Sequence, residues 1–238
     1  MATEYGYAEG ARLNLPGPNK WYQGTAWCVY HSLEVFKAFE DVFGAANTGY
    51  GKRLIRVTAY SSNSDGLNSA LRDVVFSGGP NTPLNATWNP NGQRPDVLAI
   101  APYIGPGDPI NGGSLDGADP QIATKYRAAV DWTILNYVKP FRAIAQNYGL
   151  PLVTYEGGQQ LDTHAGTWSA NPLIYDEYKF FMDRLNANGL KLFNHYTLYG
   201  AYGDNGAWGL KSAPDKPNTI LGGSPKYQAV QDWLAANP

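Results

Sequence analysis

Apolar residues recur along the chain with helical or strand periodicity, and the alternation of the two predicts the elements of the fold. A leading helix is expected over Lys20–Phe43, where apolar side chains at helical spacing precede Gly44, a common helix terminator. Four short apolar or β-branched runs predict strands at Leu54–Tyr60, Asp96–Tyr103, Pro151–Glu156 and Leu190–Leu198. An amphipathic helix is expected after each strand: over Leu67–Val75, from Asp119 to Gly149 with a kink at Pro140, from Asn171 to Gly189, and from Ser224 through Trp233.

This order predicts an α/β fold of four parallel strand-helix units joined by right-handed crossovers. Two architectures fit the alternation equally well: a small doubly wound sheet, and half of an eight-stranded (β/α)8 barrel. A length of 238 residues suits one domain spanning 1–238. The loops that follow the strands are longer than those that precede them, so a functional site is expected at the carboxyl ends of the strands.

The charge and the aromatic content of the chain indicate which kind of molecule it binds. The 18 basic and 20 acidic residues are dispersed and give a net charge of −2, which argues against binding to nucleic acid or to an anionic membrane. Aromatic residues reach 13% and are weighted toward Tyr and Trp, which combine an apolar face with a polar edge. We therefore expect a neutral polysaccharide or oligosaccharide as partner.

The chain carries little sign of export or of membrane insertion. Met1–Gly10 is polar and rich in tyrosine, so no signal peptide is expected, and no apolar run has the length of a membrane span. Cys28 is the single cysteine, which excludes an internal disulfide and favours a buried thiol.

Glu156 is the residue most favoured for chemistry. It ends the apolar run Leu152–Tyr155 and is followed by two glycines, at the carboxyl end of an expected parallel strand. The other strand ends carry groups suited to a polar, uncharged ligand: Asn63, Tyr103, His195 and Tyr196. A tyrosine hydroxyl within reach would keep the carboxylate ionised and oriented. The alternative is that Glu156 is a solvated acid or a salt-bridge partner.

A glycosidase needs a second carboxyl group, and the loops offer two candidates. Asp162 and Asp204 lie in the loops after the third and fourth strands, although aspartates in such loops more often stabilise turns. Trp168 and Trp208 lie in the same two loops and are candidates for stacking on sugar rings, with core packing as the alternative.

Other chemistries lack their motifs. The three histidines are scattered without metal-ligand spacing, so no metal is expected. No GxSxG elbow and no glycine-rich phosphate loop occurs, so no cofactor is expected.

Four segments resemble a known family: RLIRVTAY, DVLAIAPYIG, YEGGQ and NHYTLYGAYGDNGAWGLK. Their order and spacing are similar to the last four strand-loop segments of bacterial cellulase-like glycoside hydrolases of clan A, which are built on the TIM barrel. The resemblance implies that Glu156 is the nucleophile of a retaining reaction on β-linked glucan. It also implies that Tyr103 lines the site, that Trp208 floors a sugar subsite, and that the parent family is secreted.

The chain departs from that family at one essential point. The family's general acid/base is a glutamate at the end of the fourth barrel strand, commonly in an Asn-Glu pair, and no Asn-Glu occurs here. The resemblance therefore implies a carboxyl-terminal half-barrel whose acid must come from Asp162, Asp204 or a neighbouring copy. A half-barrel exposes two strand edges, so we expect a homodimer or higher oligomer. The alternative functions are a carbohydrate-binding fragment without turnover and a self-associating structural fragment.

Overall fold

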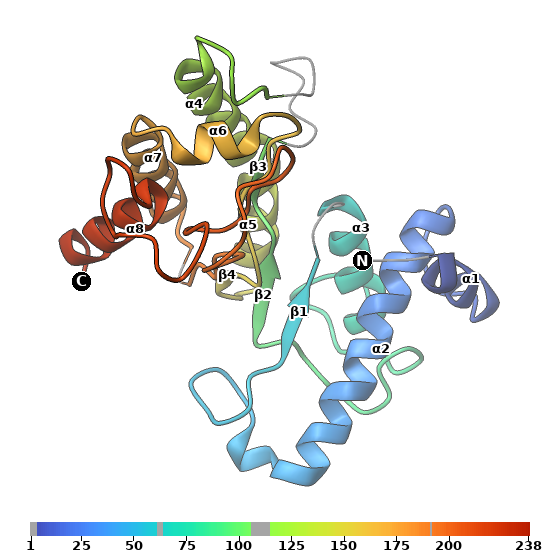
Figure 1. Cartoon of the computed structure of the whole chain (residues 1–238). Coiled ribbons are helices and arrows are strands. Elements are labelled where there is room, and N and C mark those ends of the chain that lie inside the picture. The colour runs from blue at the N-terminus through green and yellow to red at the C-terminus, as the bar shows by residue number, and fades with distance from the viewer. Residues whose placement is uncertain (1–3, 61–63, 106–114, 191) are drawn as a thin grey trace. The chain divides into compact units, whose positions relative to one another are not determined.

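The computed structural model describes residues 4–60, 64–105, 115–190 and 192–238. It is a mixed α/β structure with short parallel strands (Figure 1). Where the sequence predicts one domain, the contacts divide the chain into two compact units. The first unit comprises Met1–Ile100 and Phe141–Val153, and the second comprises Ala101–Pro140 and Thr154–Pro238.

The first unit holds the amino-terminal helices and most of a three-stranded sheet. Its elements are α1 (Glu4–Arg12), α2 (Lys20–Phe43), the 3-10 turn η1 (Ala45–Asn47), β1 (Val57–Ala59), α3 (Ser64–Ala70), the π-helical turn η2 (Leu71–Val75) and β2 (Val97–Ile100). The chain returns to it in α5 (Lys139–Asn147) and β4 (Leu152–Thr154), both of which also carry residues of the second unit.

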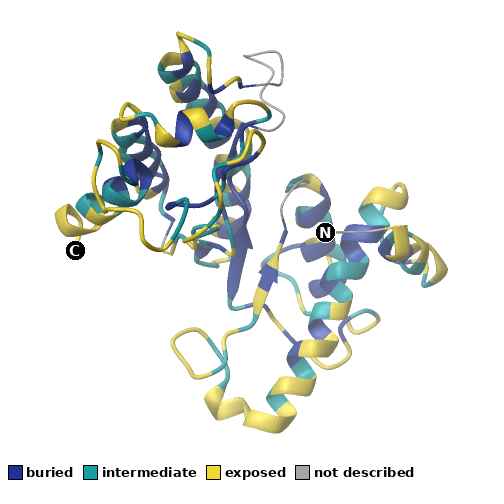
Figure 2. Ribbon diagram, in the orientation of Figure 1, coloured by how far each residue is buried: buried dark blue, intermediate teal, exposed yellow. Residues whose placement is uncertain are grey.

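The leading helix α2 has the predicted bounds. The Asn19 side chain accepts hydrogen bonds from the backbone N–H groups of Trp21 (3.0 Å) and Tyr22 (3.3 Å), which caps the amino end. Gly44 ends the helix with φ 84° and returns its N–H to the carbonyl of Glu40. The buried residues of α2 include Val29, Leu33 and Phe36, and the carboxyl-terminal part of the helix is largely exposed (Figure 2).

The sheet is parallel, as predicted. Its strands lie in the order β1-β2-β4, and Val57 of β1 is in register with Val97 of β2. Every residue of β2 is buried, as is usual for a parallel strand covered on both faces. The strands are shorter than predicted.

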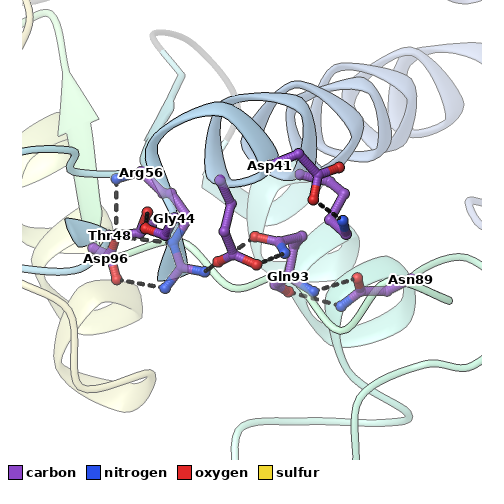
Figure 3. Close-up of polar contacts among 9 residues, drawn as sticks. Asp41, Gly44, Thr48, Arg56, Asn89, Gln93 and Asp96 are labelled. Carbon is purple, nitrogen blue, oxygen red and sulfur yellow. Dashed lines mark hydrogen bonds and ion pairs between the residues drawn. The ribbon is translucent and has the colours of Figure 1, made fainter. Parts of the chain in front are cut away.

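A network of ion pairs and hydrogen bonds lies next to the amino ends of β1 and β2 in the first unit (Figure 3). The guanidinium of Arg56 donates two hydrogen bonds of 2.9 Å to the carboxylate of Asp96, and a third, of 3.1 Å, to the side-chain carbonyl of Gln93. Gln93 in turn donates to the Glu40 carboxylate (3.1 Å) near the end of α2. The network therefore joins the helix to both strands.

The second unit packs helices around short strand segments. Its elements are β3 (Tyr103–Ile104), α4 (Ile122–Thr133), the π-helical turn η4 (Ile134–Val138), β5 (Gly158–Gln159), α6 (Ala165–Ala170), α7 (Ile174–Ala187) and α8 (Pro225–Ala236). A π-helical turn, η4, immediately precedes α5, which contains Pro140, and the kink expected at that proline stays a prediction. Arg127 of α4 pairs with Glu177 of α7 (2.8 and 2.9 Å), and Tyr175 of α7 donates to Asp232 of α8 (2.7 Å). These contacts tie α7 to its two neighbours.

The fourth predicted strand, Leu190–Leu198, is wrong. No regular strand forms over its described residues. The segment nevertheless hydrogen-bonds to the end of β4 and the residues after it: the backbone N–H of Thr154 donates to the carbonyl of Leu192 (2.9 Å), and that of Tyr196 donates to the carbonyl of Gly157 (2.9 Å). Between these bonds the Asn194 N–H goes to the Thr154 side chain (2.7 Å) instead of a backbone carbonyl, which interrupts the ladder. None of the described helices is both long enough and apolar enough to cross a bilayer.

Candidate functional site

Glu156 and Tyr103 come together in the second unit because two short strands pair. β3 and β5 are parallel, with Tyr103 in register with Gly158, two residues after Glu156. The Tyr103 hydroxyl lies near the half-buried Glu156 side chain, whose negative charge acts on the phenol. Burial, followed by the charge of Glu156, raises the pKa of Tyr103 above its usual range, so the phenol stays protonated and remains a donor. The structure thus brings together two residues that the sequence analysis places at neighbouring strand ends.

A second tyrosine adjoins this pair and was not predicted as a site residue. The Tyr137 hydroxyl, from η4, accepts a hydrogen bond from the backbone N–H of Ala101 (3.4 Å). Burial is the main cause that raises the pKa of Tyr137, and the charges of Tyr155 and Glu156 add to it. In the sequence Tyr137 occupies an apolar position of a helical stripe, so its pattern is that of a core residue.

The side chain of His195 lines the candidate site as a neutral imidazole. Its Nδ1 lies 3.0 Å from the hydroxyl of Tyr178 and its Nε2 lies 3.3 Å from the carbonyl oxygen of Trp208. A carbonyl only accepts, so Nε2 carries the proton and Nδ1 accepts from Tyr178. Burial, with a smaller effect of the charge on Lys226, lowers the pKa of His195 to about 3. His195 is therefore an oriented hydrogen-bonding group rather than a charged acid at neutral pH.

Gly158 is what lets β5 approach this histidine. Its φ is 139°, a conformation that side chains rarely adopt, and a Cβ there would lie 2.7 Å from the His195 ring and 3.1 Å from the Tyr178 hydroxyl. The second glycine of the Tyr155–Gln159 segment thus has a steric role in building the site.

Tyr196 and Trp208 form an aromatic pair near Tyr103. Their ring centroids are 6.3 Å apart with an interplanar angle of 70°, an edge-to-face pair that fixes both rings. Tyr196 is 47% exposed and is close enough to Tyr103 to raise the pKa of its hydroxyl. The glycine at position 206 makes room for the indole, because a Cβ there would lie 2.7 Å from it.

Trp168 does not belong to this surface. It is 0% exposed and packs against the ring of Tyr126, with centroids 5.6 Å apart. The stacking role proposed for it is therefore wrong, because its loop folds into α6 and buries the indole in the core.

The two candidate acids lie together around the start of α6. The carboxylate of Asp204 accepts a hydrogen bond from the backbone N–H of His164 (2.9 Å), and its carbonyl accepts from Ala165 (2.9 Å). The Asp162 carbonyl accepts from the side chain of Asn205 (3.2 Å). Asp204 thus has the turn-stabilising role that was the alternative to catalysis. Asn63, the remaining candidate, lies outside the described residues.

The arrangement provides hydrogen bonds, a carboxylate and aromatic faces. Within the described ranges no group of three or more His, Cys, Asp or Glu residues is placed to hold a metal ion. No protein-family model matches the sequence, and no curated protein matches it either.

Proposed function

We propose that the second unit is the sugar site of a glycoside hydrolase that acts on β-linked glucan, with Glu156 as its nucleophile. The observation that carries this proposal is the closeness of the Tyr103 phenol to Glu156 and to Tyr196, which pairs with Trp208. A carboxylate held by a neutral phenol and flanked by aromatic rings suits an uncharged sugar, whose apolar faces stack while its hydroxyls hydrogen-bond. The strand-helix units are, in this proposal, half of a (β/α)8 barrel.

In the proposed reaction a Glu156 oxygen attacks the anomeric carbon as the glycosidic C–O bond breaks, and the departing oxygen takes a proton from an acid. Water then hydrolyses the glycosyl-enzyme ester and regenerates the carboxylate. Tyr103 keeps one carboxylate oxygen fixed so that the other is presented to the sugar. Since Asp204 caps the start of α6, the acid is Asp162 or a group from a second copy of the chain.

A homodimer or higher oligomer accompanies this proposal. β1 is an outer strand of the described sheet, and α2 exposes Val35, Phe39 and Val42 along one stripe. Both features are normally covered in a stable protein. Static light scattering that gives a monomer mass at micromolar concentration would remove oligomerisation from the proposal.

A second candidate is sugar binding without turnover. The engagement of Asp204 in capping favours it, because that contact withholds one of the two candidate acids from catalysis. The neutral polysaccharide partner and the aromatic surface are the same in both functions.

The deciding experiment measures reducing-sugar release from soluble β-glucans by the parent chain and by Glu156→Gln, purified identically. Glucan hydrolysis by the parent that is lost in the variant supports the hydrolase. Equal activity in both indicates a contaminating enzyme. Calorimetric binding of a gluco-oligosaccharide without product release supports the binding function, and neither binding nor release refutes both.

A further inference from the structure

Lys226 lies in an unusual position for a lysine. It is the second residue of α8 and is 0% exposed. Its ammonium donates a hydrogen bond of 2.7 Å to the carbonyl oxygen of Ala207 and lies 5.1 Å from the centroid of the Tyr202 ring. In the described part of the chain no carboxylate forms an ion pair with it.

This placement costs stability. A buried ammonium loses its hydration, and one carbonyl and one ring replace only part of it. The position in the first turn of α8 adds to the cost, because a cation is unfavourable at the amino end of a helix. Burial accordingly lowers the pKa of Lys226 to about 7. A methionine of similar length would fill the same space without these costs.

The carbonyl that accepts from Lys226 belongs to a residue with a strained backbone conformation. Ala207 has φ 47°, in the left-handed region that non-glycine residues rarely adopt. The next residue is Trp208, whose carbonyl oxygen is 3.3 Å both from Nε2 of His195 and from the backbone nitrogen of Thr197. The Ala207 carbonyl therefore connects Lys226 to the peptide that sets the Trp208 ring and anchors His195.

We propose that Lys226 is a positioning residue: its ammonium holds the Ala207 carbonyl and thereby sets the orientation of Trp208 and His195 in the sugar site. The proposal rests on the proposed function for its sugar readout only. The contact with Ala207 and its effect on Trp208 are measurable in the free protein.

Titration of Lys226 gives the proposal a pH readout. The titratable groups around Lys226 are His195 and Tyr202, from the segment between α7 and α8, and Tyr178 of α7, which contacts His195. His195 is neutral above about pH 3, and the pKa values of both tyrosines are raised. Near pH 7 Lys226 is therefore the group in this cluster that changes charge.

The test follows the indole N–H resonance of Trp208 by NMR, assigned by its loss in Trp208→Phe. In the parent we expect this resonance to titrate with a midpoint near pH 7. In Lys226→Met we expect it to be displaced or broadened and to lose that titration. A parent resonance that is constant through this range, or a variant resonance identical to that of the parent, would overturn the proposal.

A matched control comes from Lys211, which is 7% exposed in the same unit and donates to Asn218 (2.9 Å) and to the carbonyl of Pro214 (3.2 Å). Lys211→Met should leave the Trp208 titration intact. For gluco-oligosaccharide binding, Lys226→Met should weaken affinity by about 10-fold and Lys211→Met by less than about 2-fold, since only the Lys226 ammonium bonds the carbonyl that precedes Trp208.

The two proposals fail separately. A parent that binds no sugar but shows the Trp208 titration refutes the sugar function and retains Lys226 as a positioning residue. If Lys226→Met does not fold, Lys226→Gln takes its place, and a Trp208 resonance that titrates in that variant as in the parent overturns the proposal.

Discussion

Tyr103 lies near Glu156 because the segments that carry the two residues pair through β3 and β5, with Tyr103 in register with Gly158. The phenol has a raised pKa and therefore stays protonated well above neutral pH. We therefore expect the neutral phenol to orient the Glu156 carboxylate.

Tyr103→Phe should lower glucan turnover without unfolding the protein. Loss of a hydrogen bond to a charged acceptor predicts a fall of about 10- to 100-fold in kcat/KM. Tyr126→Phe is the control, because its fully buried hydroxyl has no hydrogen-bond partner among the described residues. It should leave turnover and the unfolding midpoint at or above the parent values. Equal turnover in Tyr103→Phe and the parent would show that the hydroxyl does not orient Glu156.

The Arg56 network should carry measurable stability in the first unit. Arg56→Met leaves the Asp96 carboxylate without its two charge-assisted hydrogen bonds, and a loss of about 2 kcal/mol in unfolding free energy is expected. Urea denaturation followed by circular dichroism measures it. Arg12→Met removes an exposed ion pair with Glu9 and should not shift the midpoint. Equal effects of the two substitutions would contradict a structural role for the network.

Sequence signals with a local cause predict the structure best. Asn19 and Gly44 bound α2 at the predicted residues, and Ser224 with Pro225 marks the start of α8 as predicted. Glu156 and Tyr103 are likewise found together, because the carboxyl ends of parallel strands meet at one edge.

Features set by tertiary contacts could not be predicted in this way. The helix α1 contains Gly6 and Gly10, which disfavour a helix by propensity. Both allow α1 to approach α2 closely: a Cβ on Gly6 would lie 3.1 Å from the Trp27 ring, and one on Gly10 would lie 2.3 Å from the carbonyl oxygen of Gln23. Packing thus overrides propensity at this helix.

The burial of loop residues could not be predicted from local sequence either. Trp168 and Trp208 have similar sequence surroundings, rich in glycine and small residues, yet Trp168 is buried and Trp208 is partly exposed. The difference arises because the segment of Trp168 folds into the short helix α6 against Tyr126, a contact with no local signal.

Stability should rise with pH in two windows. His195 has its pKa lowered from 6.5 to about 3, so below pH 6.5 the unfolded chain binds a proton that the folded chain does not, and stability falls as pH decreases toward 3. Lys226 has its pKa lowered from 10.5 to about 7, so the unfolded chain binds the extra proton between those values, and stability increases as pH rises from 7 to 10.5.

A substitution of the titrating residue tests each of these pH ranges. One proton corresponds to a slope of about 1.4 kcal/mol per pH unit in unfolding free energy. The difference between the parent and Lys226→Met should therefore follow pH between 7 and 10.5, and that between the parent and His195→Gln should follow it between 3 and 6.5. Differences that stay constant with pH would show that neither group is shifted in the folded state.

The two loop tryptophans should separate stability from sugar binding. Trp168→Ala removes a fully buried indole and should lower the unfolding free energy by about 3 to 5 kcal/mol. Trp208→Ala removes a partly exposed ring at the site, so it should weaken gluco-oligosaccharide affinity by about 3- to 10-fold with a much smaller loss of stability. Urea denaturation and isothermal calorimetry on both variants test the pair. Because the structural roles are opposite, a stability loss in Trp208→Ala as large as that in Trp168→Ala would mean that Trp208 is a core residue, and the sugar surface would then consist of Tyr196 alone.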